Sequence, residues 1–291
     1  MTEPTPLVDR GVGPEVIHSV PVALSEALVR VTAPNPSMMT GPGTNTYLVG
    51  TTSLIVVDPG PVNDAHLAAL VAAIDGREVS MICVTHTHPD HAPGAAGLAA
   101  LVDAPLAGFG PGPSFVPDRH LMEGDVLEVA GASLRVLHTP GHASDHLCYL
   151  LEDEALALTG DHVMHGSTVV IRPPDGQVAA YLDSLERLAA THCEVLAPAH
   201  GRLIGDASGA IDEVIGHRRA REGRIAEELV GAGRASAVEL LGSVYPGLEE
   251  RRTEIATVTL LAHLQHLEDL GRATCARARS EQSISSSFEA C

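Results

Sequence analysis

The chain has 291 residues, of which 45% are apolar, so it is long enough for one large domain or for a domain with a small appendage. Its formal net charge is −19 at pH 7, and most of the acidic excess lies before His217. Such a field repels polyphosphate and offers no basic footprint, which argues against a dedicated nucleic-acid enzyme.

The 5 cysteines form no Cys-x-x-Cys pair, which indicates free thiols in a reducing compartment. The N-terminus lacks the charged region and apolar run of a signal peptide, and no apolar stretch reaches the length of a membrane span. We therefore expect a cytoplasmic protein with no membrane partner.

Apolar and turn residues alternate along the first two thirds of the chain in a pattern that predicts both strands and helices. Residues 1–20, rich in Pro and Gly, predict an extended arm. Periodicity then predicts strands at 28–32, 46–49, 54–57, 79–84, 126–129, 133–138, 147–151, 155–159 and 194–196, and helices at 64–75, 95–102 and 177–190. Strands in runs that are interleaved with helices predict an α/β fold in which helices sandwich two sheets.

The character of the sequence changes near residue 208, where strand patterns give way to helical ones at 211–229, 236–245 and 254–270. We expect a main domain over 21–208, a helical domain over 209–279 and a disordered Ser-rich tail over 280–291. The helical domain resembles either a cap beside the active site or a small winged helix. We favour the cap because the segment is not net basic.

The most informative motif is Thr85-His86-Thr87-His88-Pro89-Asp90-His91, which follows the apolar strand at 79–84. Burial alone would not select such a cluster, because each unpartnered polar ring costs a few kcal/mol. Neutral imidazoles and carboxylates are ligands for zinc and similar ions. A tight turn can aim His86 and His88 at one metal, and Asp90 and His91 at a second.

Three further ligand-type residues each follow a strand and a small or Pro/Gly turn. They are His142, Asp161 and His200. The whole pattern resembles the metallo-β-lactamase superfamily, whose four-layer αββα sandwich it implies over roughly 20–205. The resemblance implies that His86, His88 and His142 hold one metal, that Asp90, His91 and His200 hold the other, and that Asp161 bridges them. Asp58 would orient a ligand or the loop.

Asp161 stands where β-lactamases of this fold often carry Cys or Ser, so the sequence is more similar to the lactamase-β-2-like and glyoxalase II-like branch. The resemblance implies two divalent metal ions, zinc by default, with iron or manganese as alternatives. The expected function is hydrolysis of a small-molecule ester or thioester through a metal-bridging hydroxide. Asp90 would orient that nucleophile as a catalytic residue.

Other functions stay open, namely an endoribonuclease or phosphodiesterase, a lactonase and an iron-dependent sulfur dioxygenase. The acidic charge disfavours nucleic acid, and no Tyr follows Asp161 as in many lactonases. The oligomeric state and the general acid are left open. Further residues could reach the substrate or support the ligands, namely His146, His162, His165, Ser167, Thr168, Arg172 and the loop at 108–120.

Overall fold

The computed structural model describes residues 7–291, and two seven-stranded sheets face each other at its centre. The first sheet has the order β2 (Val22–Ala23), β3 (Leu28–Thr32), β4 (Asn45–Val49), β5 (Ser53–Val57), β6 (Glu78–Cys83), β7 (Leu106–Gly108) and β8 (Arg119–His120). The second has the order β1 (Gly11–Val12), β14 (Leu203–Ile204), β13 (Val195–Pro198), β12 (Leu156–Gly160), β11 (Leu147–Leu151), β10 (Ala132–His138) and β9 (Val126–Val129).

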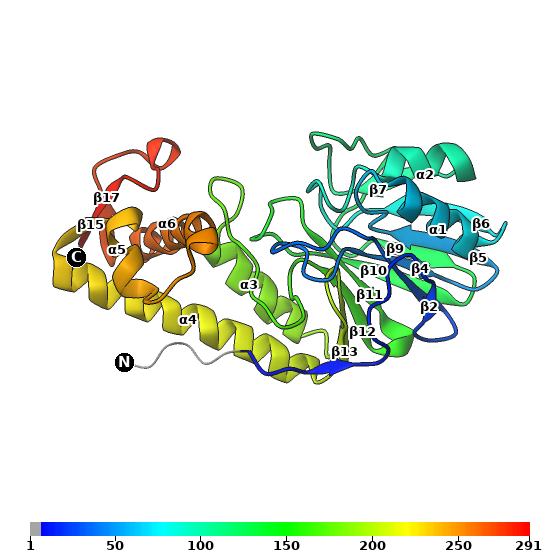
Figure 1. The fold of residues 1–291 in the computed structure, drawn as a ribbon, viewed down its shortest axis with the longest axis horizontal. Coiled ribbons are helices and arrows are strands. Elements are labelled where there is room, and N and C mark those ends of the chain that lie inside the picture. Colours follow the sequence, from blue (N-terminus) through cyan, green and yellow to red (C-terminus); the bar gives the residue numbers. More distant parts are fainter. Residues whose placement is uncertain (1–6) are drawn as a thin grey trace.

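Apolar side chains from both sheets form the central core, in which Tyr47 and Ile55 of the first sheet meet Leu134 and Tyr149 of the second. Helices α1 (Asp64–Ile74) and α2 (Ala95–Val102) cover the outer face of the first sheet. Helices α3 (Val178–Ala189) and α4 (Ala207–Ala232) cover the second. This confirms the expected four-layer αββα sandwich, which is the right-hand part of Figure 1.

Local signals explain most element boundaries. Asn63 caps α1 by accepting the backbone N–H of His66, as its position before an amphipathic run predicts. Helix α4 begins earlier than expected because the side chain of Asp206 accepts the N–H of Gly209 and caps it there. The arm also differs from expectation, since Gly11 and Val12 pair with β14 and extend the second sheet. Residues 1–6 of the arm lie outside the described residues.

The C-terminal part follows the order α4, β15 (Arg234–Ser236), α5 (Ala237–Val244), α6 (Thr253–Asp269), β16 (Ala273–Cys275) and β17 (Ser287–Ala290). Its sheet has the order β15-β17-β16. Helices α4, α5 and α6 share one apolar core with this sheet. The expectation of a disordered tail at 280–291 is wrong here, because β17 pairs with both neighbouring strands and Phe288 is fully buried.

Helix α6 is buried on nearly all sides, so it has no free face to enter a nucleic-acid groove. Ala262 packs against the core of the main domain, and Leu260 and Leu264 pack within the C-terminal part. Figure 1 shows α6 beside α3, with α4 running from the sandwich into the C-terminal part. Among the described residues, no helix is long and apolar enough to cross a bilayer.

Candidate metal centre

The turn that carries the histidine cluster is fixed by a carboxylate at the end of the neighbouring strand. Strands β5 and β6 are parallel, so their carboxyl ends meet at one edge of the sheet. Asp58, just after β5, accepts the backbone N–H of Thr85 at 2.6 Å and its hydroxyl at 2.7 Å. Asp58 has a φ of 54°, a conformation that Asp tolerates better than most residues. Its carboxylate therefore positions the turn, as the sequence predicts.

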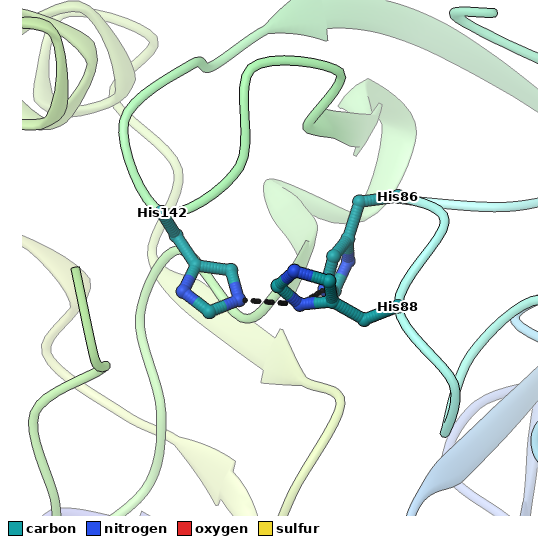
Figure 2. Close-up of side chains that lie close together, drawn as sticks. All are labelled: His86, His88 and His142. Carbon is teal, nitrogen blue, oxygen red and sulfur yellow. Dashed lines mark hydrogen bonds between the residues drawn. The ribbon is translucent and has the colours of Figure 1, made fainter. Parts of the chain in front are cut away.

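His86, His88 and His142 form the first group of converging side chains. Nδ1 of His88 lies 2.8 Å from Nε2 of His86 and 3.0 Å from Nε2 of His142. Figure 2 shows the His88 ring between the other two, with His142 reaching it from a loop after β10. The three nitrogen atoms lie within 4.8 Å of one another, which suits three ligands of one ion.

The second group contains Asp90, His91 and His200, and Asp161 lies between the two groups. Nε2 of His200 lies 3.3 Å from Oδ2 of Asp90 and 3.2 Å from Oδ1 of Asp161. The other oxygen of Asp161, Oδ2, lies 3.5 Å from Nε2 of His142. Asp161 therefore presents one oxygen to each group.

Partners outside the centre assign the histidine tautomers. Nδ1 of His142 lies 2.7 Å from the carbonyl of Val170, and Nδ1 of His200 lies 3.2 Å from that of Gly43. Nδ1 of His91 lies 2.9 Å from Oδ2 of Asp58. Because carbonyl and carboxylate oxygens only accept, each Nδ1 carries the proton. When these rings are neutral, each Nε2 directs a lone pair into the centre, which is the usual arrangement of metal-ligating histidines.

Buried atoms without partners show that these residues fit a metal ion. Nε2 of His91, Nε2 of His200 and Oδ1 of Asp161 are buried and have no hydrogen-bond partner among the described residues. Lone pairs that face one another in this way are costly unless a cation accepts them. Mixed imidazole and carboxylate donors suit zinc, and also iron or manganese.

The electrostatics of the two groups complement this fit. Burial lowers the pKa of His88 to about 4, and it lowers the pKa of His86 well below the ordinary value. Both rings are therefore neutral and available as ligands at pH 7. Burial also opposes protonation of His200, but Asp161 and Asp90 outweigh it and raise its pKa to about 9. These carboxylates create a negative potential that favours a bound cation.

The structure brings together all seven side chains that the sequence predicts as metal ligands, namely His86, His88, Asp90, His91, His142, Asp161 and His200. His146 supports them, since its Nε2 accepts the backbone N–H of Asp161 at 3.2 Å. Two other candidates lie elsewhere. His165 pairs with Asp9 at 2.9 Å, and His162 is fully buried against Tyr181.

A cleft of about 370 Å³ opens beside the centre and has His142 and Asp161 among its lining residues. Ser167 and Thr168 also line the cleft, as the sequence predicts, but Arg172 and the loop at 108–120 do not. Arg172 instead forms an ion pair with Glu254 at 3.5 Å. The loop instead packs against the ligand turn, since a Cβ on Gly112 would lie 2.3 Å from Thr87, and its Phe115 is buried with residues of α1 and α2.

Sequence reasoning missed the opposite wall of this cleft. That wall contains residues from α4, α6 and the segments between them, namely His217, Arg218, Arg221, Tyr245, Leu248, Arg252, Ile255, Ala256 and Thr259. The spacing of Arg218 and Arg221, which puts both on one face of a helix, is the only signal that could have indicated it.

Comparisons with known proteins agree with this geometry. The family model described as the metallo-beta-lactamase superfamily matches residues 39–200. The lactamase-like protein adaB of Aspergillus niger is 32% identical over 251 residues, covering 80% of this chain and 78% of that protein. The atrochrysone carboxyl ACP thioesterase of Aspergillus chevalieri is 36% identical over 246 residues, covering 78% of this chain and 76% of the relative.

Among solved structures, a metallo-beta-lactamase family protein of Thermus thermophilus superimposes with a TM-score of 0.74. It is 26% identical, and the match covers 92% of this chain and 100% of that one. Fold, converging ligands and sequence similarity together define a metal-dependent hydrolase. The chain belongs to the metallo-β-lactamase superfamily.

Proposed function

We propose that the protein hydrolyses the thioester of a small acyl group, with two divalent metal ions held by the seven converging side chains. The position of Asp161 is the main observation in support of this proposal. Its Oδ1 lies 3.2 Å from Nε2 of His200, its Oδ2 lies 3.5 Å from Nε2 of His142, and the residue also lines the cleft. The thioesterase name of a relative that is 36% identical supports a thioester as the substrate.

Bound metal ions of this kind supply two effects, polarisation of the scissile carbonyl and a lower pKa of the attacking water. The chain's own residues position them and the substrate. Burial raises the pKa of Asp90, but His91 and His200 outweigh it and lower the pKa, so this carboxylate is ionised. Its side chain is 25% exposed, against 11% for Asp161. Asp90 can therefore accept a hydrogen bond from an attacking water as well as hold a metal.

The cleft favours a leaving group that needs no proton. Asp161 is the only carboxylate among the described residues that line it. His217 also lines it, but burial lowers the pKa of this ring to about 4, so it carries no spare proton at pH 7. A thiol has an ordinary pKa of about 8.5 and leaves as a thiolate without an acid. An amide, whose amine must be protonated as it leaves, fits this cleft less well.

A phosphodiester is the second candidate, because Arg218, Arg221 and Arg252 line the same cleft. The two functions are separated by one substrate panel. Protein loaded with zinc, manganese or iron is assayed on matched thioesters, lactones and phosphodiesters, and its metal content is measured. We expect turnover of thioesters and about two metal ions per chain.

Asp161→Ala is the decisive variant, and Asp183→Ala on the exposed face of α3 is its matched control. We expect Asp161→Ala to bind fewer metal ions and to lose thioester turnover by about 100-fold or more. The control should match the wild type. Full turnover in Asp161→Ala would overturn the bridging role, and preferential turnover of phosphodiesters would replace the thioester by the second candidate.

A further inference from the structure

The far wall of the cleft concentrates positive charge in a chain whose formal net charge is −19. Arg218 and Arg221 of α4 and Arg252, which precedes α6, all line it. Leu248, Ile255 and Ala256 add apolar surface to that wall, and Met38 and Met39 from the segment between β3 and β4 also line the cleft. Because His142 and Asp161 line the same cleft, one molecule in it could contact both the metal centre and the arginines.

Arg218 is a buried cation that forms no ion pair with a carboxylate among the described residues. The residue is only 3% exposed, and one Nη donates to the carbonyl of Val169. Its guanidinium lies 5.2 Å from the centre of the Tyr181 ring. Nε is buried without a hydrogen-bond partner, and no carboxylate in residues 7–291 forms an ion pair with Arg218. Such a charge is expensive to bury without a partner.

Arg221 follows one helical turn later and faces the same cleft. Its guanidinium lies 4.1 Å from the centre of the Tyr245 ring, and Nη1 donates to the carbonyl of Val244 at 3.3 Å. These contacts restrict the side chain, and Arg221 lines the cleft together with Arg218. Guanidinium groups are suited to bind an oxyanion, because their planar N–H groups match carboxylate and phosphate oxygens.

We propose that Arg218 and Arg221 bind an anionic group of the substrate, a phosphate or a carboxylate, that is separate from the bond being cleaved. This inference rests on the proposed thioesterase function and specifies its substrate class. The anion has two candidate sources. It is either the phosphate of a phosphopantetheine-type thiol, or a carboxylate on the acyl group.

The first experiment uses metal-loaded wild-type protein and thioesters in matched pairs. One pair differs only in the phosphate of the thiol, as in phosphopantetheine against pantetheine. The other differs only at the acyl end, as in a free carboxylate against its methyl ester. We expect kcat/KM to be about 10- to 100-fold higher for the anionic member of one pair, mainly through KM. The pair that responds identifies the source. Equal kcat/KM values within both pairs would overturn the proposal.

The second experiment tests the arginine itself. Arg218→Met should abolish the preference within the responding pair, and Arg218→Lys should restore part of it because the charge returns. Arg219→Met is the matched control, since the neighbouring Arg219 pairs with Glu186 on the surface at 2.8 Å and does not line the cleft. An Arg218→Met protein that is folded by circular dichroism and retains the full preference would contradict the assignment.

Binding of thioether analogues, which cannot be hydrolysed, separates this inference from the proposed function. Calorimetry on metal-loaded protein should show tighter binding of the anionic analogue in the wild type and not in Arg218→Met. If that result holds while no thioester is hydrolysed, the anion site stands and the thioesterase function fails. If thioesters are hydrolysed but neither the charge of the analogue nor Arg218 matters, the function stands and the anion site fails.

Discussion

The backbone N–H of Asp161 donates a hydrogen bond to Nε2 of His146 over 3.2 Å. Because Nε2 accepts this bond, the neutral ring carries its proton on Nδ1, which lies 2.8 Å from the hydroxyl of Thr139. Burial lowers the pKa of His146 well below its ordinary value, which keeps the ring neutral. A buried histidine thus fixes the backbone of the residue that faces both ligand groups.

Replacing His146 by Phe should weaken metal binding. Phenylalanine keeps most of the bulk of the histidine ring, but the backbone N–H of Asp161 loses its acceptor. The side chain of Asp161 is then no longer held between the two ligand groups. We expect metal affinity to fall by about 10- to 100-fold, as for other residues that orient ligands. Competition with a chelator measures this, and His192→Asn at an exposed position is the control. Unchanged affinity in His146→Phe would show that this hydrogen bond does not position the centre.

Gly160 precedes Asp161 in a space that excludes a side chain. Its φ is 50°, and a Cβ there would lie 2.7 Å from both Nε2 of His146 and Oγ1 of Thr85. Gly166 has a φ of 72° and nothing within 4 Å, so it isolates the backbone effect. We expect Gly166→Ala to lower the free energy of unfolding by about 1–2 kcal/mol. Gly160→Ala should cost roughly 1–3 kcal/mol more because of the clash.

Urea denaturation of both metal-free variants measures this difference. Removing the metal with a chelator keeps changes in metal affinity out of the comparison. If the free energy of unfolding falls equally in the two variants, the residues around Gly160 can move to admit a Cβ. The contact with His146 then does not constrain the centre.

The sequence predicts which side chains converge, because the ligand-type residues follow local patterns. The clustering of His86, His88 and His91 has no explanation other than ligand binding. His142, Asp161 and His200 each follow an apolar strand, and the end of that strand can be recognised in the sequence. The fold brings the strand ends to one rim, so local prediction suffices. The element types of the sandwich follow from periodicity in the same way.

The missed features depend on contacts between distant segments. The packing of α6 against α4 determines which face of α4, and therefore which arginines, line the cleft. This packing cannot be predicted from a local sequence pattern. The Ser-rich composition of 280–291 predicts disorder, yet Phe288 lies opposite Ala235 and Cys275 in the small sheet. Such pairing adds burial that composition alone does not reveal.

Neutral buried histidines should make stability depend on pH. Burial lowers the pKa of His66 from its ordinary 6.5 to about 4. Between these values the unfolded chain binds a proton that the folded chain does not. The free energy of unfolding therefore falls as the pH decreases from 6.5 to 4, by at most about 1.4 kcal/mol per pH unit for this group.

The variant His66→Gln should reduce this pH dependence, because glutamine does not titrate. Urea unfolding of metal-free protein at pH 7 and pH 5 gives the slope, and His192→Asn at an exposed position is the control. The amide can still interact with Thr46, which lies 2.8 Å from Nε2 of His66. A slope equal to that of the wild type would mean that His66 is protonated in the folded chain.

Phe288 should carry much of the stability of the C-terminal sheet. It is fully buried with Leu240, Leu264 and Ala273 in the core of that part. Phe288→Ala is expected to cost about 3–5 kcal/mol, since it removes a large apolar side chain and leaves a cavity. A disordered tail would give almost no change.

Ile284→Ala is the matched control, because Ile284 lies in the same segment but is 37% exposed. We expect its cost to stay within about 0.5 kcal/mol, as for surface positions in general. Urea denaturation and limited proteolysis of both variants test this together, since a tail released from the sheet exposes its backbone to the protease. If both variants resist cleavage equally and unfold at the same urea concentration, β17 does not contribute to the folded state. That outcome would also show that β17 does not support α6, whose Leu264 shares a core with Phe288.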